Sequence, residues 1–332
     1  MRQPLSYTAV LPFACALLAA QPTPDFRATG KVVFTPIAVS DAKGQPVHGL
    51  QAADFLLYDN SVLRTIQLEE EFLPLALAVV VQNNIPVGKA IQKIQKTASI
   101  IPPLVAGDRG SVALITYSHS PFLALPPTSD ANAIVSAFRG IELIGNGKAM
   151  LDAVAMGMDV LVAQSPRRRR VLLILGETRD EGSAAKIEDV VVRAQREKVT
   201  IYAATYSSAW IQYTGKPYRD RKGDPPPPTG GGMNLFALLQ LAAPKAAEEL
   251  ANQSGGGHYS FLVQSKLEEV LQRISSDLHL QYLASFVPAD GARGFRPIRV
   301  AIKGRPELNV RARTGYWALD DALPEAPRTR SR

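Results

Sequence analysis

The 332-residue sequence predicts a doubly wound α/β domain joined to a small β-sandwich-like domain that is built from both ends of the chain. Residues 75–81 are apolar at every position, as in a strand that is buried on both faces. Strand and helix patterns alternate from there to residue 205, which is typical of a parallel sheet covered by helices. Segments rich in β-branched and aromatic residues flank this region on both sides, and they indicate the second domain.

The expected α/β domain spans residues 73–279. Apolar residues that recur about every two residues indicate strands, and those that recur about every 3.6 residues indicate helices. We expect strands at residues 75–81, 111–117, 171–175, 200–205 and 259–263, and helices at residues 88–101, 131–138, 149–163, 184–197, 235–254 and 266–278. Ser183 is a candidate N-cap for the helix at 184–197, and the glycines at 255–257 are expected to end a helix.

The β-sandwich-like domain is expected from residues 27–72 and 280–318. Residues 31–40 and 55–58 read as strands, separated by turn residues such as Gly44. Three further strand patterns follow at 281–287, 296–303 and 308–314. Because the late strands resume the early pattern, the two chain ends are expected to meet in one domain.

Residues 1–20 have the layout of a secretory signal peptide. An arginine near the start precedes an apolar stretch at 9–20, which is shorter than the roughly 20 residues needed to span a bilayer. We therefore expect cleavage near Ala20 and a protein that is secreted or held in the periplasm or cell envelope. Cys15, the only cysteine, lies inside this segment, so the mature chain has no disulfide or thiolate metal ligand. Lipidation of Cys15 is the alternative, but Pro12 and Phe13 fit a lipid-attachment motif poorly.

Two segments and the charge distribution complete the outline. Residues 213–234 contain four consecutive prolines followed by glycines and are expected to form a flexible loop, while residues 319–332 read as a disordered tail. Much of the net charge of +7 lies in the arginine run at 167–170 and in the tail, and such runs are usually solvated faces. No aromatic residues alternate with them, so the pattern disfavours nucleic acid and leaves an anionic envelope surface as a partner.

Three stretches of the chain are similar to one known family. They are an opening β motif at 36–50 followed by Asp54 and Phe55, a turn and strand at 108–117, and a closing β motif at 281–283, 296–303 and 310–316. On these residues the chain resembles the von Willebrand factor A (VWA) domain family, specifically its secreted, VWFA-related acidobacterial type. The resemblance implies a Rossmann-like VWA domain that serves in protein binding or adhesion.

The resemblance also implies a site, because this family usually holds a divalent cation in a metal-ion-dependent adhesion site. Its usual ligands are an Asp-x-Ser-x-Ser motif after the first strand, a threonine from a later loop and an aspartate after the fourth strand. The motif positions fall on Gln82, Asn84 and Pro86, with Asn83 between them. Amides and a proline thus stand where the family has a carboxylate and two hydroxyls.

The other two ligand positions also depart from the family. Lys148 takes the place of the threonine, and Gly176, followed by Glu177, takes the place of the aspartate. Because an ammonium repels a divalent cation, we expect a degenerate site without metal, in which Lys148 donates to Asn84 or Glu177. The alternatives are a solvated Lys148, or a metal held through the carbonyl oxygens of Asn84 and Gln82 with the nearby Glu177, Asp180 and Glu181. Asp152 is expected to be a structural acid.

Catalytic patterns are weak in this sequence. The four histidines, at 48, 119, 258 and 279, lack the spacing of a zinc site, and Ser118-His119-Ser120 lacks the Gly-x-Ser-x-Gly elbow of a hydrolase. We therefore expect a secreted, non-enzymatic VWA-like module that binds protein without metal or cofactor. A cryptic hydrolase, or a structural envelope component that binds anionic lipid or polysaccharide, remains the alternative.

Overall fold

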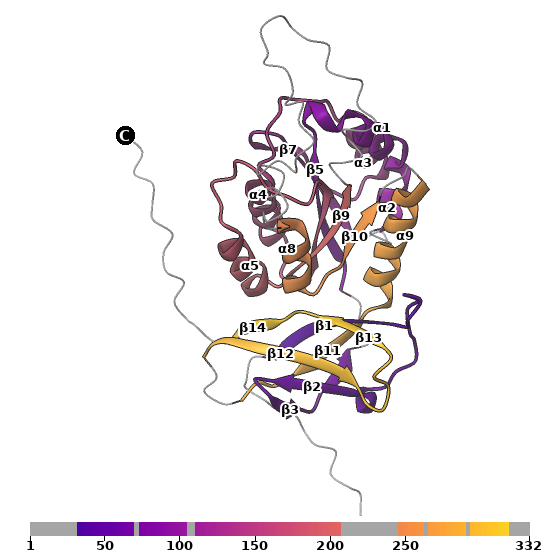
Figure 1. Ribbon diagram of the computed structural model, residues 1–332, viewed down its shortest axis with the longest axis vertical. Coiled ribbons are helices and arrows are strands. Elements are labelled where there is room, and N and C mark those ends of the chain that lie inside the picture. The colour runs from indigo at the N-terminus through magenta and orange to yellow at the C-terminus, as the bar shows by residue number, and fades with distance from the viewer. Residues whose placement is uncertain are drawn as a thin grey trace, which may run out of the picture.

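The computed structural model describes residues 32–69, 73–104, 110–206, 245–261, 265–289 and 293–318. These residues form an α/β domain that stands on a layered β domain (Figure 1). The predicted fold class is therefore confirmed. The predicted signal peptide with Cys15, the loop at 213–234 and the tail at 319–332 lie outside the described residues.

A six-stranded sheet is the centre of the α/β domain. In spatial order its strands are β10 (His258–Phe261), β9 (Val199–Tyr206), β8 (Arg169–Gly176), β5 (Leu75–Gln82), β6 (Ser111–Tyr117) and β7 (Pro121–Thr128). Every residue of β5 is buried, as its apolar run predicts. The expectation of a wholly parallel sheet is wrong at one edge, because β7 returns antiparallel to β6 through a short turn. Its prolines conceal it in the sequence, and an edge strand is where proline is tolerated.

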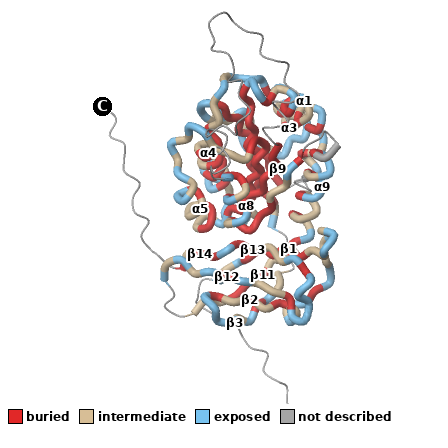
Figure 2. The backbone as a smooth tube through the Cα atoms, viewed as in Figure 1, coloured by how far each residue is buried: buried red, intermediate tan, exposed pale blue. Residues whose placement is uncertain are grey.

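Helices cover both faces of this sheet (Figure 1). One face packs on α1 (Gly88–Lys96), η3 (Ala98–Ile100), α2 (Ile101–Leu104), α3 (Ala131–Arg139) and α9 (Ser265–Leu280). The other face packs on α4 (Met150–Val162), α5 (Ile187–Arg196) and α8 (Ala246–Ser254). Alternate residues of β5 feed the two cores, Leu77 and Val79 on one side and Ala78 and Val80 on the other. Figure 2 shows this doubly covered sheet as the most buried part of the chain.

The β domain consists of two four-stranded sheets around one apolar core. The first contains β13 (Asn309–Ala312), β1 (Val33–Ser40), β11 (Tyr282–Phe286) and β4 (Gln67–Glu69); the second contains β14 (Gly315–Ala318), β12 (Gly294–Ile302), β2 (Phe55–Asp59) and β3 (Val62–Arg64). Strand β1 lies between β11 and β13, so early and late strands share one sheet, as expected. The short 3-10 turns η1 (Ala52–Asp54) and η2 (Ile85–Val87) complete the elements. Strands β3, β4 and β14 have three or four residues each, too few for a clear period.

Several predicted boundaries shift. The helix expected at 88–101 breaks after Lys96, where the Thr97 hydroxyl donates to the carbonyl groups of Lys93 and Ile94. Helix α5 begins at Ile187 with Lys186 at its N-cap position, so Ser183 is not the cap. Helix α8 ends at Ser254, and Gly255 follows it with a φ of +83°, the left-handed conformation that ends a helix, as predicted from the glycines.

The arginine run is not the solvated face that its sequence suggests. Arg169 and Arg170 belong to β8, and their guanidinium groups donate to the carbonyl oxygens of Leu278 at 2.6 Å and Glu197 at 3.0 Å. Only Arg167 of the four is exposed. Arg169 and Arg170 thus use N–H donors on the α/β domain's own backbone and are only partly exposed. No helix among the described residues combines the length and apolar character needed to cross a membrane.

Candidate functional site

The candidate site lies where the parallel strands β5, β6 and β8 end. The carboxyl ends of parallel strands meet at one edge of a sheet, and ligands of open α/β sheets bind there. Four of the predicted residues form one network at this edge, namely Gln82, Asn84, Lys148 and Glu177. The other three lie beside it: Asn83 donates to the Glu142 carbonyl group at 2.8 Å, Pro86 is exposed in η2, and Gly176 ends β8.

The side-chain amide of Gln82 is the centre of the network. Its nitrogen donates to Glu177 Oε2 at 2.9 Å and to Asn84 Oδ1 at 3.2 Å, while its oxygen accepts the backbone N–H of Glu177 at 2.7 Å. All three residues are at most 5% exposed. The Asn84 nitrogen in turn donates to the carbonyl oxygen of Gly147 at 3.0 Å. Since buried polar groups cost free energy unless they are paired, these bonds fix the loops after β5 and β8 against each other.

Lys148 closes the network from the loop before α4. Its ammonium lies 3.2 Å from Glu177 Oε2 and 3.4 Å from Glu181 Oε1. The predicted contact with Glu177 is present, whereas Asn84 is bound instead by Gln82 and by its own neighbouring loop. The Lys148 and Glu177 side chains are 23% and 6% exposed, so Lys148 is not simply solvated. A backbone bridge, in which the Glu181 N–H donates to the Lys148 carbonyl oxygen at 3.0 Å, joins the two loops that carry these side chains.

Gly176 has no room for a side chain. A Cβ atom placed on it would lie 2.4 Å from the hydroxyl oxygen of Tyr117 and 3.0 Å from Gln82 Oε1. Tyr117 ends β6, is 1% exposed, and its hydroxyl has no hydrogen-bond partner among the described residues. Burial, followed by the negative charges of Glu177 and Asp180, raises the pKa of Tyr117 well above its usual value. Tyr117 is not among the residues that the sequence predicts for this site.

The carboxylates of Asp180 and Asp152, at the same edge, accept hydrogen bonds from backbone N–H groups. Asp180 Oδ1 accepts the Leu151 N–H at 2.9 Å and the Ser183 hydroxyl at 2.5 Å, so it caps α4. Asp152 accepts the N–H groups of Ala184 and Ala185 at 3.0 and 2.8 Å, which fits the structural role predicted for it. Within the described part of the chain, no three His, Cys, Asp or Glu residues gather closely enough to hold a metal ion.

Exposed hydrophobic residues that were not predicted from the sequence lie beside the network. Ile85 is 58% exposed, Leu143 is 43% exposed and Ile144 is 57% exposed. Backbone bonds from Ile85 to Gly145 and from Ile144 to Asn83, both 2.9 Å, place their two segments side by side. We call Ile85, Leu143 and Ile144 the edge cluster. Large apolar residues grouped in this way mark interaction sites more often than single exposed ones.

The predicted histidine positions do not form a catalytic group. His119 Nε2 lies 3.4 Å from the backbone nitrogen of Asn146, His258 Nε2 lies 2.8 Å from the Thr205 hydroxyl, and His279 Nδ1 lies 2.7 Å from the Ser275 carbonyl oxygen. Each is therefore paired with a loop, strand or helix group rather than with a carboxylate. Burial lowers the pKa of His258, the effect expected where a ring loses water.

Taken together, the fold and this edge define a doubly wound α/β domain whose strand-end loops form a polar site next to an apolar cluster. Residues 87–213 match the model of the von Willebrand factor type A domain, and the chain therefore contains a domain of this family. The matched segment begins after Gln82, Asn83 and Asn84, so it does not include the first loop of the site. No curated protein matches the chain.

Several solved structures are similar in fold. A von Willebrand factor type A protein from Catenulispora acidiphila is 9% identical, with a TM-score of 0.48 over 86% of this chain and 72% of that one. The conserved hypothetical protein BatB from Bacteroides thetaiotaomicron is 16% identical, with a TM-score of 0.44 over 62% of this chain and 99% of that one. An aerotolerance-related membrane protein from Bacteroides fragilis is 12% identical, with a TM-score of 0.44 over 61% and 98%. At these values the likeness carries no information about function.

Proposed function

We propose that this protein is a secreted, non-enzymatic binding module whose VWA domain recognises a protein partner without a metal ion. The observation that carries the proposal is the contact of 3.2 Å between the Lys148 ammonium and the buried Glu177 carboxylate. At this distance and near a protein surface, two unit charges interact by about 4 kcal/mol or more, so a second cation at Glu177 would have to overcome or displace the first.

The donor set does not fit the hard divalent cation that the fold family implies. Such ions bind carboxylate, hydroxyl or carbonyl oxygens in near-octahedral geometry. Here the Gln82 oxygen is committed to a backbone N–H, and Glu177 is paired with an ammonium. An aspartate at the position of Gly176 would displace Tyr117. These three features support a degenerate adhesion site in which hydrogen bonds and an ion pair between side chains, rather than a metal ion, hold the loops together.

The edge cluster supports protein as the partner. Ile85, Leu143 and Ile144 offer apolar area, and the charged pair of Lys148 and Glu181 lies on the neighbouring loops. An apolar centre with a polar rim is the usual anatomy of a protein interface. The signal-peptide pattern of residues 1–20 supports secretion to the periplasm, the cell envelope or the outside.

Two alternatives are less well supported. A hydrolase needs a nucleophile, a base and an orienting acid within hydrogen-bond reach, and the described histidines have other partners. An envelope component that binds anionic lipid or polysaccharide would use the arginine run, of which Arg169 and Arg170 are engaged by backbone carbonyls.

The proposal is tested by capture of envelope proteins on the immobilised full chain, with and without EDTA. We expect the same partner in both conditions, and loss of that partner with Ile144→Asp. Leu63→Asp is the matched control, because Leu63 is 55% exposed on β3 of the other domain. Capture that EDTA abolishes, or saturable heat on titration with Mg²⁺, Ca²⁺ or Mn²⁺, would contradict metal independence. Equal capture by the Ile144→Asp and Leu63→Asp variants would show that the edge cluster is not part of the interface.

A further inference from the structure

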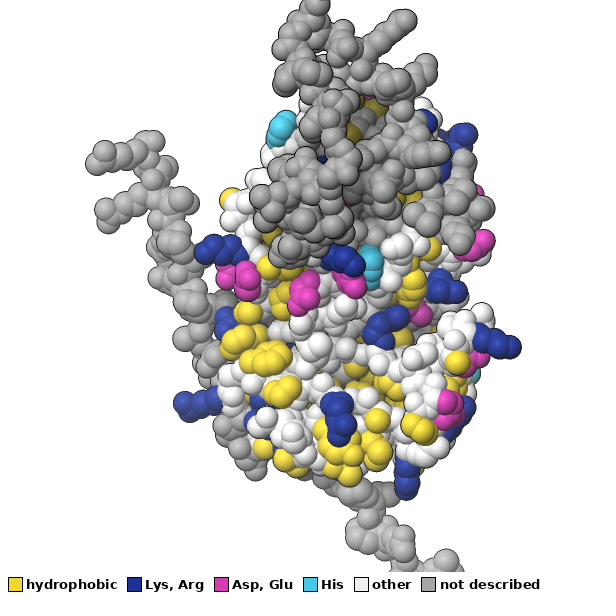
Figure 3. Space-filling view, in the orientation of Figure 1, with side chains coloured by type: hydrophobic (Ala, Val, Ile, Leu, Met, Phe, Trp, Pro, Cys, Tyr) yellow, Lys and Arg dark blue, Asp and Glu magenta, His cyan; other side chains and the backbone are white. Residues whose placement is uncertain are grey.

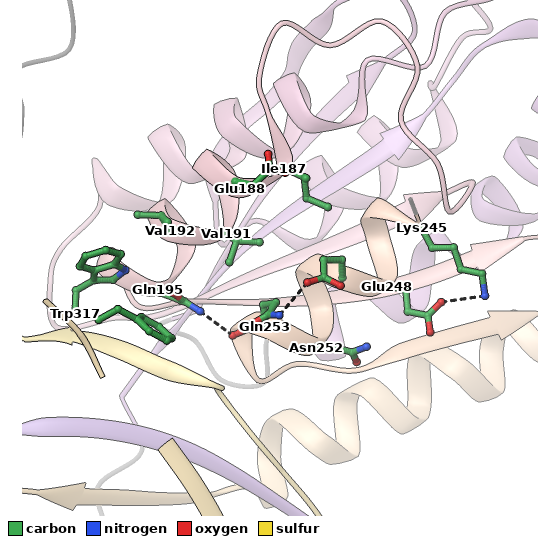
Figure 4. Close-up of a pocket in the computed structure, with 12 residues that line it drawn as sticks. Ile187, Glu188, Val191, Val192, Gln195, Lys245, Glu248, Asn252, Gln253 and Trp317 are labelled. Carbon is green, nitrogen blue, oxygen red and sulfur yellow. Dashed lines mark hydrogen bonds and ion pairs between the residues drawn. The ribbon is translucent and has the colours of Figure 1, made fainter. Parts of the chain in front are cut away.

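A second candidate surface is a groove at the junction of the two domains, away from the strand-end network. Its walls come from α5, α8 and the paired strands β12 and β14, and its volume is about 710 Å³. That volume lies within the range of about 300 to 1,000 Å³ that is typical of ligand clefts. Figure 4 shows side chains of α5 and α8 facing this space, with Trp317 at one end.

Aromatic side chains form the apolar end of the groove. Phe295 is 44% exposed and lies against Trp317, with ring centroids 5.8 Å apart. The guanidinium carbon of Arg196 sits 4.4 Å from the centre of the Trp317 ring, a cation–π contact that orients the indole. A pre-oriented aromatic pair of this kind binds apolar side chains at little cost in conformational entropy.

The other side of the groove is acidic. Glu188, Glu248 and Glu249 line it, together with Lys245, which is paired with Glu248 at 3.4 Å, while the cation Arg196 lies at the Trp317 end. This is a local reversal in a chain whose net charge is +7. The space-filling view shows acidic side chains close above a hydrophobic area at the boundary between the domains (Figure 3).

The polar groups between these ends suit a polypeptide backbone. The exposed side chain of Asn252 lines the groove next to Gln253, whose amide already donates to Glu249 Oε1 at 2.9 Å. An asparagine amide can both donate to a backbone carbonyl group and accept from a backbone N–H. A bound chain would thus meet apolar, acidic and amide groups in one open groove.

From this arrangement we propose that the groove bounded by α5, α8 and the Phe295–Trp317 pair binds an extended segment of another protein in which basic and apolar residues alternate. Apolar side chains of the segment rest on Phe295 and Trp317, and its lysine or arginine side chains face Glu188, Glu248 and Glu249. The choice of partner rests on charge complementarity, which sets partner preference and encounter rate more than it sets total affinity. This surface does not depend on the network at Glu177.

The test uses a fluorescently labelled, end-blocked peptide of alternating valine and lysine, with a valine and glutamate peptide as its counterpart. Binding to the full chain is followed by anisotropy. We expect the lysine peptide to bind at least about tenfold more tightly, a difference of about 1.4 kcal/mol, and to weaken as salt screens the glutamates. Equal binding of the two peptides, or no binding of either, overturns the proposal.

Variants locate the binding on the protein. Glu248→Gln combined with Glu249→Gln is expected to weaken the lysine peptide about fivefold, because exposed charge pairs contribute about 0.2–1 kcal/mol each. The matched control is Glu268→Gln combined with Glu269→Gln, which changes two exposed glutamates on α9, outside the groove. Phe295→Ala and Trp317→Ala should each weaken binding, with circular dichroism reporting the fold. Equal effects of the two glutamate pairs refute the site.

One further outcome identifies another occupant. Residues 319–332 follow Trp317 closely and contain three arginines. If the full chain fails to bind the lysine peptide while a chain ending at Ala318 binds it, the groove is filled by this segment of the same chain, and the proposal of a separate partner is wrong.

Discussion

Among the described residues, two carboxylates are buried and are paired in different ways, Asp59 in the β domain and Glu177 in the α/β domain. Asp59 is 0% exposed and accepts bonds from Arg296 at 2.7 Å, Arg64 at 3.2 Å and the Tyr316 hydroxyl at 3.2 Å. Glu177 is 5% exposed and is held by one ammonium and one amide. Both charges are compensated, but only the second lies at an edge where ligands bind.

The different partners of the two carboxylates make Asp59 a rigid structural site and Glu177 an adaptable one. Guanidinium groups hold Asp59 in the rigid fork geometry that matches a carboxylate, and its partners come from both ends of the chain. Lys148 reaches Glu177 on a flexible stem from a loop and also contacts an exposed glutamate. Asp59 therefore links strands from the two ends of the chain within the β domain, whereas the Glu177 network fixes the loops at the carboxyl ends of β5 and β8.

The largest effect is expected from removing Asp59. Asp59→Ala leaves Arg296, Arg64 and the Tyr316 hydroxyl without their shared acceptor, and breaking a buried pair costs about 3–5 kcal/mol. Urea denaturation should show this loss of unfolding free energy. Arg305→Ala is the control, because Arg305 is 46% exposed and pairs only with exposed Glu307. A loss below about 1 kcal/mol would mean that Asp59 does not anchor the domain.

A smaller effect is expected at Gly176. Gly176→Ala places a methyl group 2.4 Å from the Tyr117 hydroxyl oxygen, and overpacking of a buried site costs about 1–3 kcal/mol. Tyr117→Phe removes that oxygen and should restore part of the loss, although Gln82 remains close. A double-mutant cycle on thermal or urea unfolding measures the coupling. Strict additivity of the two changes would show that the hydroxyl does not exclude a side chain at Gly176.

Lys148→Met should cost about 1–2 kcal/mol at neutral pH, because it leaves the buried Glu177 with only hydrogen bonds to compensate its charge. Adding Glu177→Gln should recover much of that loss. The control is Glu181→Gln, where the glutamate is 58% exposed and the expected change is within about 0.5 kcal/mol. If Glu181→Gln costs as much as Lys148→Met, the contact with Glu177 is not the one that matters.

The smallest effect concerns acid stability. Burial raises the pKa of Asp59, but the hydrogen bond and charge of Arg296, together with Tyr316 and Arg64, outweigh it, and the pKa lies below its ordinary value of 3.8. The folded state thus gains stability from Asp59 above pH 3.8, and this gain is lost as the pH falls through that value and then through the lower folded pKa. Urea midpoints at pH 7 and pH 3 should differ more for the native chain than for Asp59→Ala. An equal difference would assign the acid sensitivity to other groups.

Much of the fold could be read from the sequence because the strands of the central sheet are buried on both faces. Apolar runs such as β5 have no competing interpretation once helices alternate with them. Strand β7 was missed because its exposed and partly exposed residues and its prolines look like a loop. The β domain was predicted from matching patterns at the two ends, but its short strands depend on partners far away in the sequence.

The site was only partly readable. Alignment of the strand ends with the family's motif brought Gln82, Asn84 and Glu177 to one edge, and likeness to the family's threonine stretch brought Lys148 there. Tyr117 and the edge cluster were missed because their role depends on distances that no sequence pattern contains, such as the close approach of Tyr117 to Gly176. Ser183 was predicted to cap a helix, but its hydroxyl donates to Asp180 Oδ1 and accepts the backbone N–H of Asp152.

The β domain built from both ends of the chain has a mechanical consequence. Strands β1 and β13 pair directly from Ile37–Ala312 to Ser40–Asn309, and the α/β domain is inserted between β4 and β11, which are themselves paired. Tension applied between residues 32 and 318 would first load the end pairs Val33–Phe286 of β1–β11 and Gly294–Ala318 of β12–β14, and only then the β1–β13 ladder. The α/β domain is attached at two neighbouring points, the paired strands β4 and β11, so the ladders of the β domain bear such tension before the strand-end loops of the α/β domain do.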